Sequence, residues 1–193
     1  MTGVQTCALP ISLALNPMLP YVDTKDVVVV AASGTTGAGR SAKINLIGSE
    51  VMNSMTSYKF GGVHQHTPEI EQSTGATISF TPILAPMPRG ILATVTAKIT
   101  KEFSDIHKIY VDAYQNEEFV WILPQGQLPK TSAVIGSNYA QIQVAVDEHS
   151  NRIVASAVID NLGKGAAGQA IQNANLIAGF EETMGLKFPG VGV

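Results

Sequence analysis

Hydrophobic residues along the chain alternate in some segments with a period of two, which is typical of strands. Residues 26–32 form a β-branched run and predict a fully buried strand. The next two predicted strands are joined by the proline-punctuated turn 85–90, and the last two form a hairpin through 147–151. The strands expected from these patterns cover residues 26–32, 77–82, 90–100, 120–123, 140–146 and 152–159.

Other segments carry the helical spacing. Thr67 followed by Pro68 predicts a helix start with a hydroxyl cap, and Gly75 ends that helix. Ser104 is the expected cap of a later amphipathic helix. The expected helices cover residues 44–55, 68–73, 104–116 and 166–180. Helices packed on one face of a mixed, largely antiparallel sheet predict an α+β fold.

Composition and charge narrow the class of protein. The chain has 193 residues, of which 45% are hydrophobic, enough for one domain with a sizeable core. A net charge of −3 without a basic cluster indicates neither a nucleic-acid groove nor an anionic-membrane patch. No apolar run reaches the roughly 20 residues of a membrane-spanning helix. The single cysteine, Cys7, excludes a disulfide framework within the chain and a cysteine-cluster metal site.

Residues 1–12 are expected to be a non-native segment. They have neither the basic region nor the cleavage site of a signal peptide, and residues 4–11 resemble one reading frame of a sequencing-adapter oligonucleotide. The alternative is a poorly ordered native terminus. Cys7 is a candidate nucleophile only if these residues are native.

The glycine-rich loop 33–40 follows the first predicted strand. Residues 34–41 are close to a Walker A loop, but that loop requires a lysine where Arg40 stands, and arginine is not equivalent there. A tight turn with Arg40 paired to an acid is the stronger interpretation. Anion binding by backbone amides and Arg40 stays open.

His64 and His66 lie two residues apart, directly before a predicted helix. A zinc site is disfavoured because no further ligands stand at suitable spacing, so no metal is expected. Solvent exposure or capping is the plain alternative, and a proton carrier near neutral pH is the catalytic one. Residues 160–170 are rich in small side chains, which suit either close packing or the approach of a ligand.

Four segments together carry a family resemblance. Residues 33–40 are Ser-Gly-Thr-Thr-Gly-Ala-Gly-Arg, and residues 64–70 are His-Gln-His-Thr-Pro-Glu-Ile. Residues 80–92 contain Phe-Thr-Pro and Met-Pro-Arg-Gly-Ile-Leu, and residues 160–169 are Asp-Asn-Leu-Gly-Lys-Gly-Ala-Ala-Gly-Gln. From about residue 13 to residue 186 the chain resembles the N-acetyl-gamma-glutamyl-phosphate reductase family.

The resemblance implies a domain organisation. Residues 13–193 correspond to the catalytic and dimerisation domain, similar to the C-terminal domain of the glyceraldehyde-3-phosphate/semialdehyde dehydrogenase superfamily. The family's N-terminal Rossmann domain is expected to be absent, in keeping with the lack of a Gly-x-Gly-x-x-Gly motif. The family's Gly-Cys-Tyr-Pro-Thr is also missing, and its nucleophile aligns with Thr6, one residue from Cys7.

The resemblance also implies roles for individual residues. His64 would carry the proton and His66 is the rival for that role, while Gln65 replaces an arginine of the family motif. The residues expected to bind substrate are Ser33, Gly34, Arg40, His66 and Arg89. Those expected to contact the cofactor NADP are Gly37, Ala38, Asn161, Gly163, Lys164 and Gly165.

The expected function is the NADPH-dependent reduction of N-acetyl-glutamyl 5-phosphate to N-acetyl-glutamate 5-semialdehyde, a step of arginine biosynthesis in the cytoplasm. The expected partners are the small-molecule substrate and further copies of the chain, with no nucleic acid and no membrane. The 193-residue chain alone is expected to be inactive. The alternatives are a related semialdehyde dehydrogenase and a non-catalytic binding or oligomerisation module.

Overall fold

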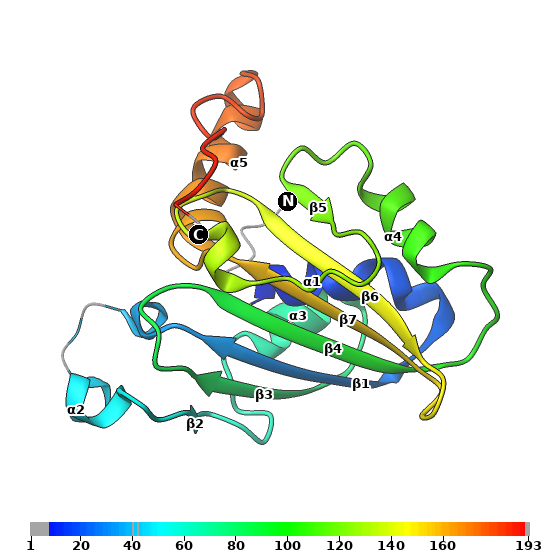
Figure 1. Ribbon diagram of the computed structural model, residues 1–193, viewed down its shortest axis with the longest axis horizontal. Coiled ribbons are helices and arrows are strands. Elements are labelled where there is room, and N and C mark those ends of the chain that lie inside the picture. The colour runs from blue at the N-terminus through cyan, green and yellow to red at the C-terminus, as the bar shows by residue number, and fades with distance from the viewer. Residues whose placement is uncertain (1–7, 40, 42, 192–193) are drawn as a thin grey trace.

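The computed structural model describes residues 8–39, 41 and 43–191. These residues build a mixed seven-stranded sheet with the order β2-β3-β1-β4-β7-β6-β5 (Figure 1). The β1/β3 and β5/β6 pairs are parallel, and the other neighbours are antiparallel. The strands are β1 Val22–Ser33, β2 Thr56–Ser57, β3 Ile78–Leu84, β4 Ile91–Ile99, β5 Val120–Ile122, β6 Ala140–Asp147 and β7 Arg152–Ile159.

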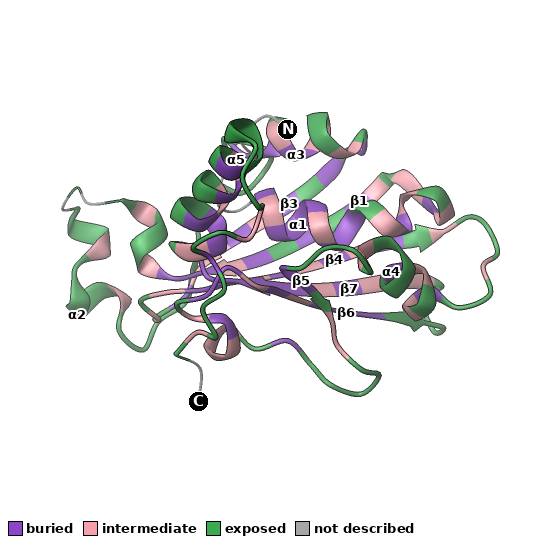
Figure 2. Cartoon of the chain, turned by 90° about the horizontal axis from the view of Figure 1, so that it is seen from above, coloured by how far each residue is buried: buried purple, intermediate pink, exposed green. Residues whose placement is uncertain are grey.

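Helices cover one face of this sheet, which confirms the predicted α+β class. Figure 2 shows α1, α3 and α4 on the same side of the strands. The helices are α1 Ala8–Leu15, α2 Gly48–Val51, α3 Thr67–Thr74, α4 Ile106–Tyr114 and α5 Gly168–Ala178. A π-helical turn, Gly163–Ala167, leads into α5, so the last helical segment begins three residues before the predicted start.

The first long strand is not fully buried, which corrects the prediction. Val27 and Val29 point into the core beneath the helices, whereas Val28 and Val30 are 36% and 41% exposed on the opposite face. The reason is that a strand turns successive side chains to opposite faces, and the described helices cover only one of them. A run of four valines therefore supplies both the core and an open apolar face.

Helix α1 lies against the middle of the sheet. Ala8 and Ile11 are fully buried, and the hydroxyl of Tyr110 on α4 donates a hydrogen bond to the carbonyl of Ala14. Residues 8–12 thus contribute to the core, while the origin of residues 1–12 stays a prediction.

The predicted helix over 44–55 is wrong. The chain forms a short 3₁₀ turn, Ile44–Leu46, followed by the single turn of α2 and by β2. Ile47 and Met52 are exposed, so the apolar spacing finds no surface to pack on. A short segment without tertiary packing does not hold a long helix.

Two other predicted helices are confirmed, with changes at their first residues. Helix α3 has His66 rather than Thr67 at its N-cap, and it ends at Gly75 in the left-handed conformation with φ of 70°. Helix α4 is capped by Asp105 instead of Ser104, because the Asp105 carboxylate accepts a backbone N–H of the first turn.

The turn 85–90 does not close a hairpin. Strands β3 and β4 lie on either side of β1, so this turn carries the chain across the end of β1. The glycine-rich loop that follows β1 leaves the sheet at the same end. The fold thereby brings residues 33–38 and 85–90 together.

Candidate functional site

Asp160 and Asn161 directly follow β7 and are completely buried. The Asp160 carboxylate pairs with the guanidinium of Arg89 at 2.7 Å and accepts the backbone N–H groups of Gly136 at 2.5 Å and Leu162 at 2.9 Å. A buried carboxylate needs such partners because desolvation of an unpaired charge is costly. Asp160 therefore ties the 85–90 turn to the loops on both sides of it.

Asn161 connects the same turn to the glycine-rich loop. Its Oδ1 accepts the backbone N–H of Gly90 at 2.7 Å, and its Nδ2 donates to the hydroxyl of Thr36 at 2.8 Å. The Thr36 hydroxyl in turn donates to the carbonyl of Pro88 at 2.6 Å. Both ends of the Asn161 amide thus have protein partners.

Gly34 permits the close approach of these two loops. Its backbone N–H donates to the carbonyl of Gly90 at 2.9 Å, and a Cβ added at Gly34 would lie 2.9 Å from the backbone nitrogen of Arg89. Real Cβ atoms do not approach backbone so closely, so a side chain here would push the loops apart.

A cavity of about 390 Å³ opens beside the glycine-rich loop. It lies between the ends of β1 and β3, the 3₁₀ turn Thr35–Ala38 and the segment that precedes α3. Five of the residues expected to bind substrate or cofactor line it together with the expected proton carrier His64: Ser33, Gly34, Gly37, Ala38 and His66. The fold therefore joins two motifs that are separated by about 25 residues in the sequence.

His64 is held in a buried, largely aromatic setting. Its side chain lies against the rings of Phe80, Tyr58 and His66, with centroids 5.0, 5.6 and 4.9 Å away, and the residue is only 5% exposed. Burial, with smaller contributions from the nearby His66 and Lys59, lowers the pKa of His64 from 6.5 to about 4. The imidazole is therefore neutral at pH 7.

One hydrogen bond determines which nitrogen of His64 carries the proton. Its Nδ1 accepts the backbone N–H of His66 at 3.2 Å. A neutral imidazole has one donor nitrogen and one acceptor nitrogen, so Nε2 bears the hydrogen. His64 is thus arranged to donate a hydrogen bond through Nε2.

His66 is also buried, and burial lowers its pKa, while Glu69 acts in the opposite direction. The alternative of solvent-exposed histidines is wrong, since β3, α3 and the preceding loop enclose both imidazoles, whereas the alternative of capping holds in position for His66, the N-cap residue of α3. Among the described residues no group of three or more His, Cys, Asp or Glu side chains could hold a metal ion.

The other expected site residues lie away from the cavity lining. Arg89 is paired with Asp160, and Gly163 and Gly165 belong to the turn that wraps the end of β7. Lys164 is buried, with its Nζ 2.6 Å from Oε1 of Gln172 on α5 and 5.3 Å from the ring centre of Phe119. Burial lowers the pKa of Lys164 to about 8. The Lys164 side chain therefore points into the protein.

Two expected residues, Cys7 and Arg40, lie outside the described residues. Conversely, the cavity has lining residues that the sequence did not single out: Lys43, Asn45, Tyr58 and Lys59. They come from the irregular segment between β1 and α3, where no periodic pattern marks a function. The two glycines after Phe60 were the available signal that this segment turns sharply.

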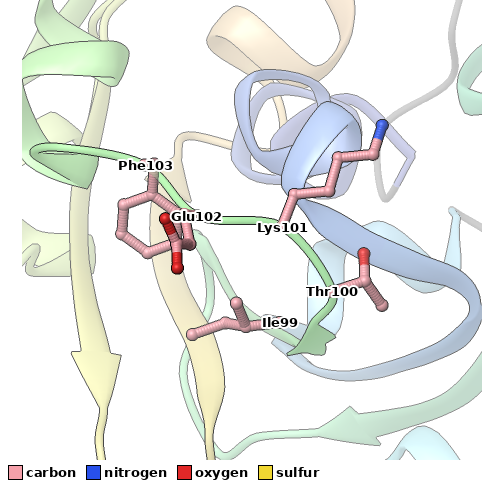
Figure 3. A pocket seen from close by; sticks show the side chains of 5 residues that line it. All are labelled: Ile99, Thr100, Lys101, Glu102 and Phe103. Atoms are coloured by element: carbon pink, nitrogen blue, oxygen red, sulfur yellow. The ribbon is translucent and has the colours of Figure 1, made fainter.

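A second hollow, lined by Ile99–Phe103, lies just after β4 (Figure 3). All its side chains come from one continuous stretch, and the amino group of Lys101 extends away from Phe103 and Glu102 (Figure 3). A site for chemistry needs polar groups that converge from several elements. The hollow beside His64 meets that condition, whereas this one does not.

Comparison with known families assigns most of the chain to one family model. Residues 7–161 match the family model described as semialdehyde dehydrogenase, dimerisation domain. N-acetyl-gamma-glutamyl-phosphate reductase from Acidothermus cellulolyticus is 55% identical over 190 residues, which cover 93% of this chain and 55% of that protein. The Renibacterium salmoninarum protein of the same name is 53% identical over 86% of this chain and 51% of its own length. The expected resemblance is confirmed, and the chain spans about half the length of these relatives.

Solved structures agree on the fold. Aspartate semialdehyde dehydrogenase II from Vibrio cholerae has a TM-score of 0.71 at 16% identity, covering 90% of this chain and 61% of that one. A probable aspartate-semialdehyde dehydrogenase from Pseudomonas aeruginosa has a TM-score of 0.72, also at 16% identity, covering 89% of this chain and 61% of that one. Within the part of the chain that is described, no helix is long and apolar enough to cross a membrane.

The depressed pKa of His64 predicts a loss of stability in acid. Between pH 6.5 and about 4 the unfolded chain binds a proton at His64 that the folded chain does not, so the free energy of unfolding falls as the pH drops. Each tenfold difference in proton affinity is worth about 1.4 kcal/mol, so the loss reaches at most about 3 kcal/mol. Urea unfolding across this pH range measures it. His64→Gln should make the profile shallower, and the buried His66, whose pKa is also lowered, should account for the slope that remains.

The ion pair of the buried Asp160 with the partly exposed Arg89 predicts a second stability effect. Asp160→Asn removes the charge that accepts from Arg89 and from backbone N–H groups, and it should lower the free energy of unfolding by about 1–3 kcal/mol. Asp112→Asn breaks the exposed pair with Lys108, at 2.7 Å, and should cost less than about 1 kcal/mol. Equal losses for the two variants in urea unfolding would contradict the role assigned to Asp160.

Proposed function

Because the chain belongs to the semialdehyde dehydrogenase, dimerisation domain family, we propose that it forms the catalytic part of an N-acetyl-gamma-glutamyl-phosphate reductase. The observation that carries this proposal is the pair of buried imidazoles, His64 and His66, beside a cavity that includes two lysines and, among the described lining residues, no carboxylate. Such a cavity suits an anionic substrate and a proton transfer.

The proposed reaction converts N-acetyl-glutamyl 5-phosphate into N-acetyl-glutamate 5-semialdehyde and phosphate, in the cytoplasmic biosynthesis of arginine. By the family resemblance, a cysteine thiolate attacks the acyl carbon and the phosphate group leaves. When bound, NADPH would supply the hydride that reduces the resulting thioester. By the resemblance, Thr6 aligns with the family nucleophile, and Cys7 is the next residue. Both positions lie outside the described residues.

His64 is proposed as the proton carrier, and in the geometry described it first acts as a neutral hydrogen-bond donor. Its Nδ1 already accepts a backbone N–H, and its pKa is about 4, so the neutral ring presents Nε2–H. A neutral donor stabilises negative charge that develops on the acyl oxygen, and it can hydrogen-bond a thiolate. In this arrangement His64 does not accept a thiol proton through Nε2 until its Nδ1 hydrogen bond is broken.

Among the described residues, Gly37 and Ala38 are the ones best placed to contact NADP. Gly37 and Ala38 line the cavity without bulky side chains, which suits the close approach of a flat ring. The Lys164 amino group is bonded to Gln172, and the Asn161 amide is bonded to Gly90 and Thr36, so both side chains already have protein partners. We therefore propose that most cofactor contacts come from a separate nucleotide-binding domain.

Helix α5 supports the presence of such a domain. It buries the polar side chains of Gln172 and Asn175, while Ile171 is exposed and Ile177 is 88% exposed. An exposed apolar stripe of this kind marks an interaction surface. The proposal is that this stripe packs on the nucleotide-binding domain of the full-length reductase.

A turnover assay tests the proposed reaction. The full-length reductase should oxidise N-acetyl-glutamate 5-semialdehyde in the presence of NADP⁺ and phosphate, whereas the 193-residue chain should show no activity. In the full-length enzyme, His64→Ala should lower kcat by about 10²–10³-fold, the range typical of a lost hydrogen-bond donor to developing negative charge. His66→Ala should have a smaller effect.

Three outcomes would change this picture. Turnover by the 193-residue chain alone would refute the expectation that it is inactive. A larger loss of kcat for His66→Ala than for His64→Ala would assign the role of proton carrier to His66. Activity of the full-length protein only with aspartate semialdehyde would favour the related dehydrogenase instead.

The open face of the sheet supports a further part of the proposal, the formation of a homodimer. Val28 and Val30 lie on β1, the third strand in the sheet order. Their apolar side chains are exposed on the face opposite α1, α3 and α4. The sheet face extends across β4 and β7, and its self-association would remove this apolar surface from water.

Charges placed on this face test the dimer. Val28→Asp and Val30→Asp should each shift sedimentation velocity profiles from dimer towards monomer, because a buried unpaired charge opposes association. Val111→Asp is the matched control, since Val111 is exposed on α4, on the helical side of the sheet. A dimer that survives both sheet-face substitutions would place the interface elsewhere.

A further inference from the structure

We propose that Lys59 is a substrate-binding residue, whose ammonium group holds an anionic group of the substrate in the cavity and is itself positioned by Gln65. This inference rests on the proposed function for the identity of the substrate. It does not rest on that function for the presence of an anion site. The motifs that carry the family resemblance do not include Lys59.

The contact between Lys59 and Gln65 supplies the geometry. Nζ of Lys59 donates a hydrogen bond to Oε1 of Gln65 at 3.1 Å, and both residues line the cavity beside His64. Gln65 lies between the two buried histidines in the sequence. Both residues are exposed, so the ammonium group lies where the cavity opens to solvent.

The chemistry of the partner is as informative as the contact. A carboxylate partner would neutralise the ammonium group, whereas the Gln65 amide orients it and leaves its full charge available. An ammonium group has three donors, and one hydrogen bond to Gln65 leaves others for a ligand oxygen. This arrangement is what an anion site requires.

The backbone at Lys59 is unusual for a residue with a side chain. Its φ is 45°, in the left-handed region, and Gly61 and Gly62 follow with φ of 80° and 82°. A non-glycine residue in this region costs roughly 1 kcal/mol or more, and such strain gathers at functional sites. At this position glycine would adopt the backbone conformation without strain, yet the residue is a lysine.

The electrostatic surroundings of the cavity favour an anion. The charged side chains among its described lining residues are Lys59 and Lys43, both positive. The positive charge of Lys59 also contributes to the lowered pKa values of His64 and His66, which shows that it acts on both imidazoles. An anion bound at Lys59 would therefore lie within electrostatic reach of the proposed proton carrier.

The ligand chemistry is that of a small oxyanion. The proposed substrate carries both a phosphate and a carboxylate, and either group suits an ammonium partner. Titrating the chain separately with inorganic phosphate and with N-acetyl-glutamate distinguishes the two sources. Preference for phosphate would assign Lys59 to the leaving group, and preference for N-acetyl-glutamate would assign it to the carboxylate end.

Imidazole NMR of the 193-residue chain gives a direct readout of binding. Phosphate or N-acetyl-glutamate should shift the ring signals of His64 and His66, while His107 and His149, which lie outside the cavity lining, serve as internal controls. Lys59→Met should weaken this binding by about tenfold or more, and Lys59→Arg should retain most of it. Gln65→Glu should weaken it as well, because the new carboxylate neutralises Lys59.

Lys101→Met is the matched control, since Lys101 is an exposed lysine beside the separate hollow after β4. Unchanged anion affinity in Lys59→Met, or no shift of His64 and His66 with either probe in the unmodified chain, would overturn the inference. In the full-length reductase, Lys59→Met should raise KM about tenfold with little change in kcat. If that enzyme failed to turn over the acyl phosphate while Lys59-dependent anion binding persisted, the proposed function would fail and the anion site would stand.

Discussion

The buried charge of Asp160 organises one end of the sheet. Its carboxylate is removed from water, so it draws Arg89 and several backbone N–H groups around itself. Asn161 extends the same arrangement to Thr36 in the glycine-rich loop. None of these loops has a hydrophobic core of its own. Their positions, and hence the wall of the cavity, depend on two polar side chains at the end of β7.

Residues with binding chemistry also have partners within the protein. Arginine and lysine are the natural candidates for phosphate and carboxylate ligands, and Arg89 and Lys164 were both expected to bind a ligand. In the fold, Arg89 offsets the charge of Asp160, and Lys164 is buried against Gln172 and Phe119. Residue type and motif are visible in a sequence, whereas the partner of a charge depends on which strands end side by side.

The features that the sequence predicted best are local ones. The hairpin of β6 and β7, the left-handed Gly75 at the end of α3 and the amphipathic α4 follow from short-range patterns. The convergence of the glycine-rich loop with His64 and His66 was available only through the family resemblance.

The sequence missed features that depend on distant contacts. It did not show that β1 lies between β3 and β4, or that residues 44–55 have no surface on which to form a helix. Lys59 escaped notice because its backbone is irregular, so no hydrophobic period surrounds it. Its proximity to Gln65 arises from a turn whose geometry is decided by two glycines.

The position of β1 between β3 and β4 has a consequence for folding during synthesis on the ribosome. Four valines of β1, residues 27–30, emerge before the parallel partner β3, which ends about 50 residues later, at Leu84. At roughly 5–20 residues per second, this strand waits on the order of 3–10 s for its first neighbour. A β-branched run that is exposed for that long is prone to pair with other nascent chains, and Lys25 and Asp26 stand directly before it as charged gatekeepers. Demand for a chaperone should therefore be greatest during this interval, before β3 and then β4 enclose the strand.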